Sequence, residues 1–209
     1  MTISPSRFYA FWLLRLWEGG EAFIVIDGID ASGKTTQTRV LEESLERRGF
    51  KVLYRIHPSD DNFFGLKTRY YLEKRGRAAH LGAAFYYMLD VLRSTLLYGW
   101  RKGIVKIFTR YLMGAAYLPK FLYEPAYLFF ATALPTSNLM FILDVTPAEA
   151  IRRLKDRGKK PEMFERFEDL EEMRARIVGL ARKYSWKIID AEKPILEIHE
   201  EIMSFLTDE

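Results

Sequence analysis

Apolar residues occur in two alternating patterns from about residue 23 onward. Short continuous runs, such as residues 23–26, are typical of strands buried on both faces of a parallel sheet. Longer segments carry apolar residues at helical spacing, as Val40, Leu41 and Leu45 do before Gly49. Strands that alternate with helices predict a parallel sheet with right-handed crossovers. We therefore expect an α/β fold with helices on both sides of a central parallel sheet.

The expected elements follow one another closely. We predict strands over residues 23–26, 51–56, 104–108, 139–145 and 187–190. We predict helices over residues 34–48, 66–75, 83–100, 168–184 and 194–206, and one that opens at Pro147 and runs through Arg153 and Lys155.

Two apolar segments suggest a membrane at first sight. Residues 8–14 are flanked by Arg7 and Arg15, as in a signal peptide, but the run is short and shows no clear cleavage site. We expect residues 4–18 to form an amphipathic helix that packs on the domain or a partner, with membrane-surface binding as the alternative. Residues 125–143 carry no charge, but residues 135–138 (Pro-Thr-Ser-Asn) divide them into a helix end, a turn and a strand.

The expected organisation is a helical extension over residues 1–22 and one domain over residues 23–209. Residues 155–170 are rich in charge and hold Gly158 and Pro161, which indicates a short lid.

Charge and composition narrow the possible ligands and cellular compartment only slightly. The 32 Lys and Arg residues against 28 Asp and Glu residues leave a net charge of +4, which suits a cleft that attracts phosphorylated substrates on an otherwise solvated surface. Long basic runs are absent, so nucleic-acid binding is not indicated. The chain has no cysteine, which excludes disulfides and favours the cytoplasm. The three histidines show no metal-ligand spacing.

The strongest chemical signal is the glycine-framed segment 28–35, which fits the pattern G-x-x-x-x-G-K-[ST]. Gly28 and Gly33 permit a bend whose backbone amides bind phosphate. Lys34 supplies a point charge for the β- and γ-phosphates, and the Thr35 hydroxyl can hold Mg²⁺. The alternative is an ordinary strand, turn and helix. The preceding apolar strand and following helix favour a P-loop phosphotransferase that binds ATP.

Residues 23–37 resemble the thymidylate kinase family, with Asp30 and the ending Thr35-Thr36-Gln37 as the distinctive parts. The resemblance continues in the same order along nearly all of the chain from Phe23. The further matching segments are Pro58-Ser59-Asp60 with Gly65 and Arg69, Arg110-Tyr111, residues 141–147, residues 153–165, and Ile189-Asp190-Ala191 with Pro194.

Membership of that family would imply a P-loop NTPase fold, a homodimer, and transfer of the ATP γ-phosphate to dTMP with Mg²⁺. Arg110 would bind the acceptor phosphate, although a plain surface arginine is the alternative. Because Ala31 stands where some members carry an arginine, Arg157 and Arg153 of the lid would supply the neutralising cation; for Arg157 a solvated charge is the alternative. On the acceptor side, the resemblance assigns Asp30 to the sugar and adds Pro58, Arg69 and Tyr111. Around ATP it assigns Gly28, Ile29, Asp30, Ala31, Ser32, Gly33, Lys34, Thr35 and Thr36.

The chain departs from the family pattern on the acceptor side. Thr109 replaces an aspartate that helps to organise Mg²⁺, for which Asp27 or Asp144 could compensate. Tyr87-Met88 falls where the family has an Asp-Arg pair whose arginine reads thymine, and Asp90 and Arg93 lie several residues away. His57 stands where the family usually has Glu or Phe.

Several hypotheses remain open. The chain is a thymidylate kinase with a rebuilt base pocket, a kinase for another nucleotide or nucleoside, or a paralogue that binds nucleotide but catalyses poorly. In a variant of the first hypothesis, Arg93 reads the base. A non-enzymatic hypothesis is a nucleotide-binding module whose segment 4–18 docks on a partner or a membrane. Dense aromatic residues between Phe85 and Phe130 fit a core or a dimer face better than base stacking.

Overall fold

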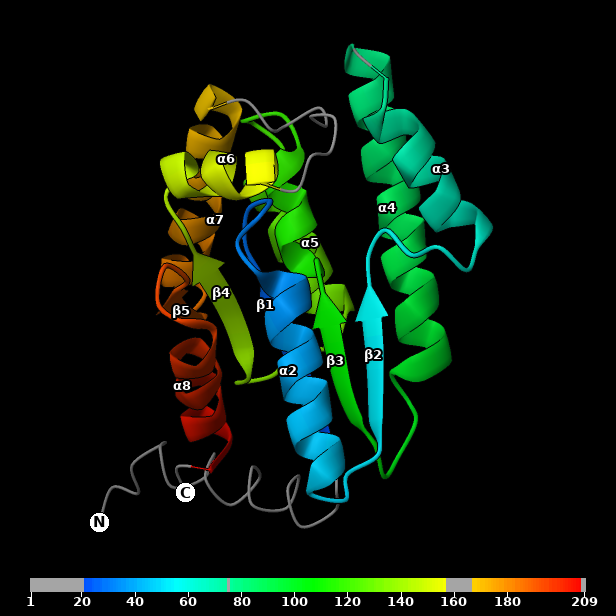
Figure 1. Ribbon diagram of the computed structural model, residues 1–209. Helices are drawn as coiled ribbons and strands as arrows, with labels where there is room; N and C mark the ends of the chain where they lie inside the picture. The colour runs from blue at the N-terminus through cyan, green and yellow to red at the C-terminus, as the bar shows by residue number, and fades with distance from the viewer. Residues whose placement is uncertain (1–20, 75, 157–166, 208–209) are drawn as a thin grey trace, which may run out of the picture.

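The computed structural model describes residues 21–74, 76–156 and 167–207. Its centre is a sheet of five strands in the order β2-β3-β1-β4-β5, and every neighbouring pair is parallel (Figure 1). The strands are β1 (Ala22–Asp27), β2 (Val52–Ile56), β3 (Val105–Thr109), β4 (Met140–Asp144) and β5 (Lys187–Asp190). The predicted α/β fold with a parallel sheet is confirmed.

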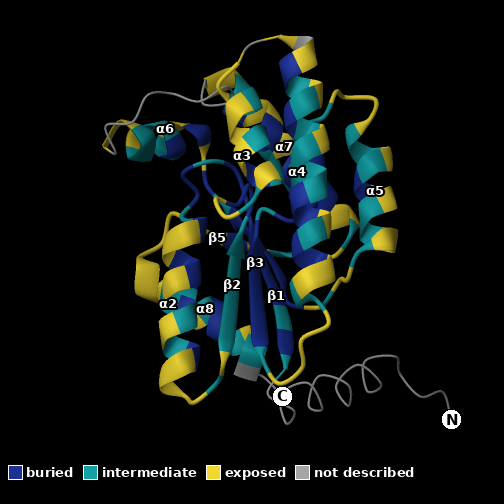
Figure 2. Ribbon diagram, turned by 90° about the vertical axis from the view of Figure 1, so that its right-hand side faces the viewer, coloured by how far each residue is buried: buried dark blue, intermediate teal, exposed yellow. Residues whose placement is uncertain are grey.

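Helices cover both faces of this sheet. Figure 2 shows α2 and α8 on one face and α4 and α5 on the other. The helices are α2 (Lys34–Arg47), α3 (Phe63–Leu72), α4 (Arg77–Tyr98), the 3-10 helix η1 (Leu112–Tyr117), α5 (Tyr123–Ala133), α6 (Pro147–Asp156), α7 (Phe167–Lys183) and α8 (Ile195–Thr207).

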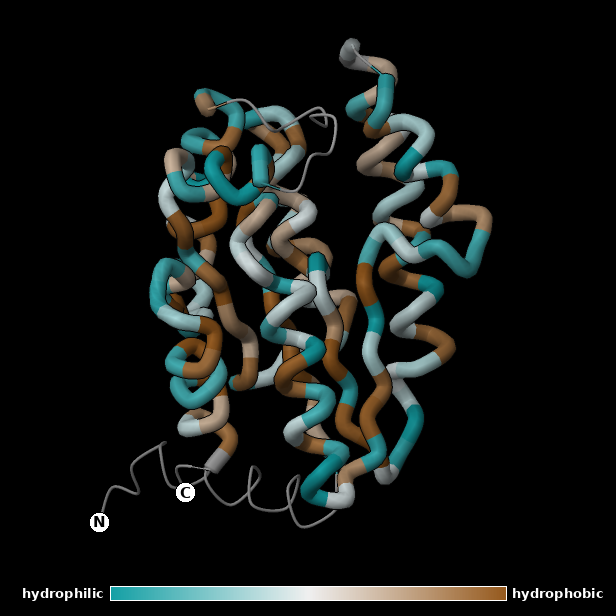
Figure 3. The backbone as a smooth tube through the Cα atoms, in the orientation of Figure 1, coloured by the Kyte–Doolittle hydropathy of each residue, from teal (hydrophilic) through white to brown (hydrophobic). Residues whose placement is uncertain are grey.

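The central strands form the core. Ile24, Ile26, Ile107 and Phe141 are fully buried, as expected for strands covered on both faces. The edge strand β2 is only partly buried along its whole length. Figure 3 shows hydrophobic residues recurring along β2, β3 and β4, between the two helical layers.

Several elements differ from the prediction, and α3 spans Phe63–Leu72 where residues 66–75 were expected. Helix α4 begins at Arg77 and not at residue 83. Gly82 lies inside this helix, where a Cβ atom would come within 2.8 Å of the Tyr71 ring. The glycine therefore allows α3 and α4 to approach closely. The 3-10 helix η1 was not predicted, because one short turn of this kind leaves no periodic apolar pattern.

Several predictions fall outside the described residues. They include the helix at residues 4–18, Arg157, and residues 157–166 of the lid predicted over residues 155–170. The uncharged segment 125–143 contains the end of α5 and most of β4, as predicted. In the part of the chain that the structure describes, none of the helices has the length and apolar character needed to cross a bilayer.

Candidate active site

The predicted phosphate loop bends between β1 and α2, at the carboxyl edge of the sheet (Figure 1). Gly33 caps α2 in the left-handed region, with φ of 95°, and no side chain caps the helix. Gly28 has φ of 146°, and a Cβ atom there would lie 2.5 Å from the Leu143 carbonyl oxygen. Because the first amides of a helix lack intrahelical acceptors, this uncapped end suits a bound anion.

Lys34 folds back over its own loop. Its Nζ donates hydrogen bonds to the carbonyl oxygens of Gly28, at 2.9 Å, and Ile29, at 2.6 Å. The side chain is buried. The ammonium group is therefore held inside the bend, where a polyphosphate would meet it.

Asp27 joins the phosphate loop to the segment after β3. One carboxylate oxygen accepts the Gly28 amide at 2.9 Å, and the other accepts the Tyr111 amide at 2.9 Å. Burial raises the pKa of Asp27, while the Lys34 charge acts against that shift. The sequence had suggested Asp27 only as a substitute for the missing aspartate at Thr109. Its position at the end of a buried strand, directly before the loop, was the available signal.

Arg110 forms an ion pair with Asp30, so the structure brings these two predicted residues together. Arg110 has φ of 56°, an uncommon conformation for a residue other than glycine. The Tyr87 hydroxyl donates to the Arg110 carbonyl oxygen, and also to that of Tyr111 at 3.3 Å. This contact from α4 fixes the backbone that carries the guanidinium group.

A cavity of about 260 Å³ lies beside Asp30 and Arg110. Pro58, Tyr111 and Met88 line it, as do residues of α3, α4, η1 and α5. Arg69 does not; it bonds instead to the Pro58 carbonyl oxygen at 3.1 Å and to Asp60 at 2.7 Å. The lining combines residues of four helices with residues outside them, and sequence spacing alone did not identify helix positions such as Val91 and Phe130.

The residues considered for base reading lie elsewhere. The buried Asp90 carboxylate accepts hydrogen bonds from the Ser59 amide at 2.7 Å, the Ser59 hydroxyl and the Asn62 side chain. Arg93 lies 4.0 Å from Asp61 and is not among the residues lining the cavity. In this structure Met88, and not Arg93, faces the predicted acceptor site.

Candidate metal ligands are few. Thr35 is exposed in the first turn of α2. Thr109 is buried and donates to the Arg55 carbonyl oxygen at 3.4 Å. Asp144 accepts two hydrogen bonds from Arg174, at 2.7 and 2.8 Å. Within the described residues, no group of three or more His, Cys, Asp or Glu side chains is arranged to hold a metal. A Mg²⁺ ion beside the phosphate loop would have the Thr35 hydroxyl as a candidate ligand.

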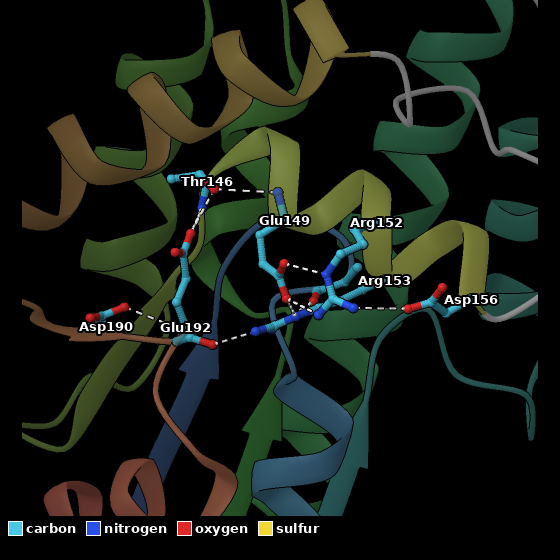
Figure 4. Close-up of polar contacts among 9 residues, drawn as sticks. Thr146, Glu149, Arg152, Arg153, Asp156, Asp190 and Glu192 are labelled. Atoms are coloured by element: carbon cyan, nitrogen blue, oxygen red, sulfur yellow. Dashed lines mark hydrogen bonds and ion pairs between the residues drawn. The ribbon is translucent and has the colours of Figure 1, made fainter.

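Arg153 of α6 connects the phosphate loop to the segment after β5 (Figure 4). Its guanidinium donates to Glu149 at 2.7 Å, to the Ala31 carbonyl oxygen at 3.4 Å and to that of Ala191 at 2.8 Å. Arg152 also binds Glu149, and these hydrogen bonds lower the pKa of Glu149 to about 2. Arg153 is thus placed against the phosphate loop by α6, as a lid cation would need to be.

The strand, the glycine-framed loop and the helix define a P-loop protein, and the cavity lies beside that loop. Within the class of P-loop proteins, the amino-acid sequence identifies the family. Residues 26–202 match the Thymidylate kinase family, and the chain belongs to it.

Known relatives agree with this assignment. A probable thymidylate kinase from Pyrococcus abyssi is 30% identical over 197 residues, which covers 90% of this chain and 96% of that protein. Another, from Pyrobaculum calidifontis, is 30% identical over 195 residues, which covers 88% of this chain and 95% of the relative.

Solved structures share the fold. Thymidylate kinase from Candida albicans superposes with a TM-score of 0.73 at 17% identity, covering 89% of this chain and 91% of that one. Deoxyadenosine kinase from M. mycoides, solved with bound dATP, gives a TM-score of 0.66 at 19% identity, covering 89% of this chain and all of its own.

Proposed function

We propose that this protein transfers the γ-phosphate of ATP to dTMP, giving ADP and dTDP. The observation that carries the proposal is the ion pair between Asp30 of the phosphate loop and Arg110 of the cavity. This pair links the phosphate loop to the cavity, which supports a donor site beside an acceptor site, as direct transfer requires. The family membership and the names of the relatives support the same reaction.

In the proposed reaction, an oxygen of the dTMP phosphate attacks the γ-phosphorus. A new P–O bond forms while the bond from the γ-phosphorus to the bridging oxygen breaks, and ADP leaves. The open amides of the loop and Lys34 hold the donor phosphates. Arg110 orients the acceptor phosphate, and Asp30 accepts a hydrogen bond from its sugar. Mg²⁺, held at Thr35, would screen the phosphate charges.

Arg153 is the described cation best placed to act from the lid side. It already contacts the Ala31 carbonyl oxygen in the phosphate loop. A rearrangement of its side chain toward the γ-phosphate would add positive charge where it develops during transfer. Arg157, outside the described residues, is the second candidate.

A second candidate function is phosphorylation of another nucleotide or nucleoside. Met88 favours it, because this side chain lines the cavity where the family's base-reading arginine was expected. Incubating the protein with ATP, Mg²⁺ and each nucleoside monophosphate or nucleoside in turn, with products separated by chromatography, tests both functions. Conversion of dTMP ahead of the other acceptors supports the first. Phosphorylation of another acceptor but not of dTMP supports the second function. ATP binding without any phosphorylated product supports a non-catalytic module.

We also propose that residues 23–209 work as one kinase domain, in the cytoplasm, and as a homodimer. Exposed apolar side chains on α4, such as Leu81, Phe85 and Leu96, supply a surface that a second copy would cover. Light scattering coupled to size exclusion tests the dimer. A monomer mass for the wild type would contradict the dimer, and a dimer that Leu96→Glu does not weaken would contradict an interface on α4.

A further inference from the structure

The charged side chains of the cavity gather at one end. Among the described lining residues, the carboxylates are Asp27 and Asp30, and the guanidinium belongs to Arg110. Asp27 is the last residue of β1, and Arg110 comes directly after β3, so these groups lie at the carboxyl edge of the sheet. Asp27 holds two backbone amides, and Asp30 is paired with Arg110. This end suits the phosphate and sugar of the acceptor.

The rest of the cavity is mostly apolar. Met88 and Val91 extend from α4, and Phe130 and Leu134 extend from α5 and the residue after it. Two further lining residues, Leu92 and Phe129, keep 40% and 63% of their surface exposed, so the cavity also has an apolar opening. An acceptor whose phosphate sits at Arg110 would place its other end among these side chains.

Most hydroxyl groups in the lining already donate to the protein backbone. Thr68 donates to the Phe64 carbonyl oxygen at 2.9 Å, and Tyr111 donates to that of Pro135 at 3.2 Å. Tyr87 donates to the backbone beside Arg110. Burial raises the pKa of both tyrosines, so they remain protonated donors. His80 and Tyr117 are the other polar side chains in the described lining.

We infer that the acceptor site recognises the base by shape and apolar contact around Met88, and not by hydrogen bonds to the base. This inference rests on the proposed kinase function and specifies its acceptor: a nucleoside monophosphate whose base needs the right size but not a particular hydrogen-bonding edge. The two modes differ greatly in selectivity. A site built to hydrogen-bond a substrate rejects an analogue without those groups by about 10⁴-fold or more, whereas apolar pockets discriminate far less.

A shape mimic of dTMP separates the two modes. In the 5′-monophosphate of difluorotoluene deoxyriboside, a ring of nearly the same shape as thymine replaces the strong hydrogen-bonding groups with fluorine and C–H. We expect kcat/KM for this compound to lie within about tenfold of that for dTMP. A loss of about 10⁴-fold would overturn the inference.

Binding measurements keep this test independent of the proposed reaction. If the wild-type protein with ATP and Mg²⁺ phosphorylates neither compound, the proposed function fails, and calorimetric Kd values for the same two compounds decide the inference. Values within about tenfold of each other support apolar recognition. Binding of dTMP with no measurable binding of the mimic overturns it.

Variants locate the recognition. We expect Met88→Arg to lower kcat/KM, or weaken binding, at least tenfold more for the mimic than for dTMP, because a buried guanidinium without an acceptor is poorly solvated. Met88→Leu, the matched apolar variant, should keep the wild-type ratio. If His80→Ala or Tyr117→Phe instead lowers dTMP turnover strongly and spares the mimic, hydrogen bonds read the base and the inference is wrong.

Discussion

Asp30 and Arg110, 80 positions apart in the sequence, form an ion pair across the gap between the phosphate loop and the end of β3. Without a bound acceptor, each neutralises the other. An acceptor phosphate would draw the guanidinium toward itself, while the acceptor's sugar would engage the carboxylate. An acceptor would therefore have to exchange this ion pair for contacts of its own with Asp30 and Arg110.

Removing Arg110 should damage the acceptor site selectively. We expect Arg110→Ala to lower kcat/KM for dTMP about thirtyfold or more, because truncating one partner of a close charge contact costs about 2–5 kcal/mol. The KM for ATP should change little. Steady-state kinetics with each substrate varied in turn measure both effects.

Arg47→Ala is a suitable control, since Arg47 lies at the far end of α2 and pairs only with Glu43 among the described residues. It should behave as the wild type. If Arg110→Ala instead impaired ATP alone, Arg110 would belong to the donor site.

Asp90 should matter for stability and not for base recognition. Its buried carboxylate accepts hydrogen bonds from Ser59 and Asn62, which hold the loop between β2 and α3. We expect Asp90→Ala to lower the free energy of unfolding by about 3 kcal/mol, because these donors lose a charged partner. Urea unfolding followed by circular dichroism measures the change.

Arg93→Ala provides the comparison on the same helix. Its long contact with Asp61 predicts a loss below about 1 kcal/mol. This variant should also retain the wild-type preference among nucleotides. A change of preference in Arg93→Ala would restore Arg93 as the base-reading residue.

His57 should make stability depend on pH. Its ring contacts Phe108 and Tyr87, and burial lowers its pKa from 6.5 to about 4. The unfolded chain therefore takes up a proton below pH 6.5 that the folded chain does not. Stability should fall as the pH drops from about 6.5 toward 4, by at most about 1.4 kcal/mol per pH unit from this residue.

His57→Phe isolates that contribution, because phenylalanine keeps an aromatic ring and cannot titrate. Between pH 7 and pH 5 the unfolding free energy of the wild type should fall relative to that of the variant, measured by urea unfolding at each pH. Parallel curves for the two proteins would show that His57 does not contribute.

Local signals in the sequence were enough for the sheet and the phosphate loop. The strands are continuous apolar runs. The conformation of the loop depends on Gly28, Gly33 and Lys34, which lie within a few residues of one another. The ion pair between Asp30 and Arg110 was not predicted, because the two residues lie 80 positions apart. The resemblance to a family was needed to assign them to one acceptor.

Features that depend on packing between distant elements were harder to predict. The helix was predicted to begin at residue 83, whereas α4 begins at Arg77 and contains Gly82, whose missing side chain leaves room for Tyr71. The cavity combines side chains from four helices, so Phe130 and Val91 gave no sign of a shared role. Arg69 was predicted at the acceptor, but its bonds to Pro58 and Asp60 hold it outside the cavity lining.

The most direct test of the central proposal is dTDP formation from ATP and dTMP by the wild-type protein and by Lys34→Ala. The Lys34 ammonium group is fixed inside the phosphate loop and would contact the transferred phosphate. We expect steady dTDP production by the wild type and a loss of about 10³-fold or more in the variant, with its circular dichroism spectrum unchanged. Equal dTDP production by the two proteins would contradict the assignment of this loop as the donor site.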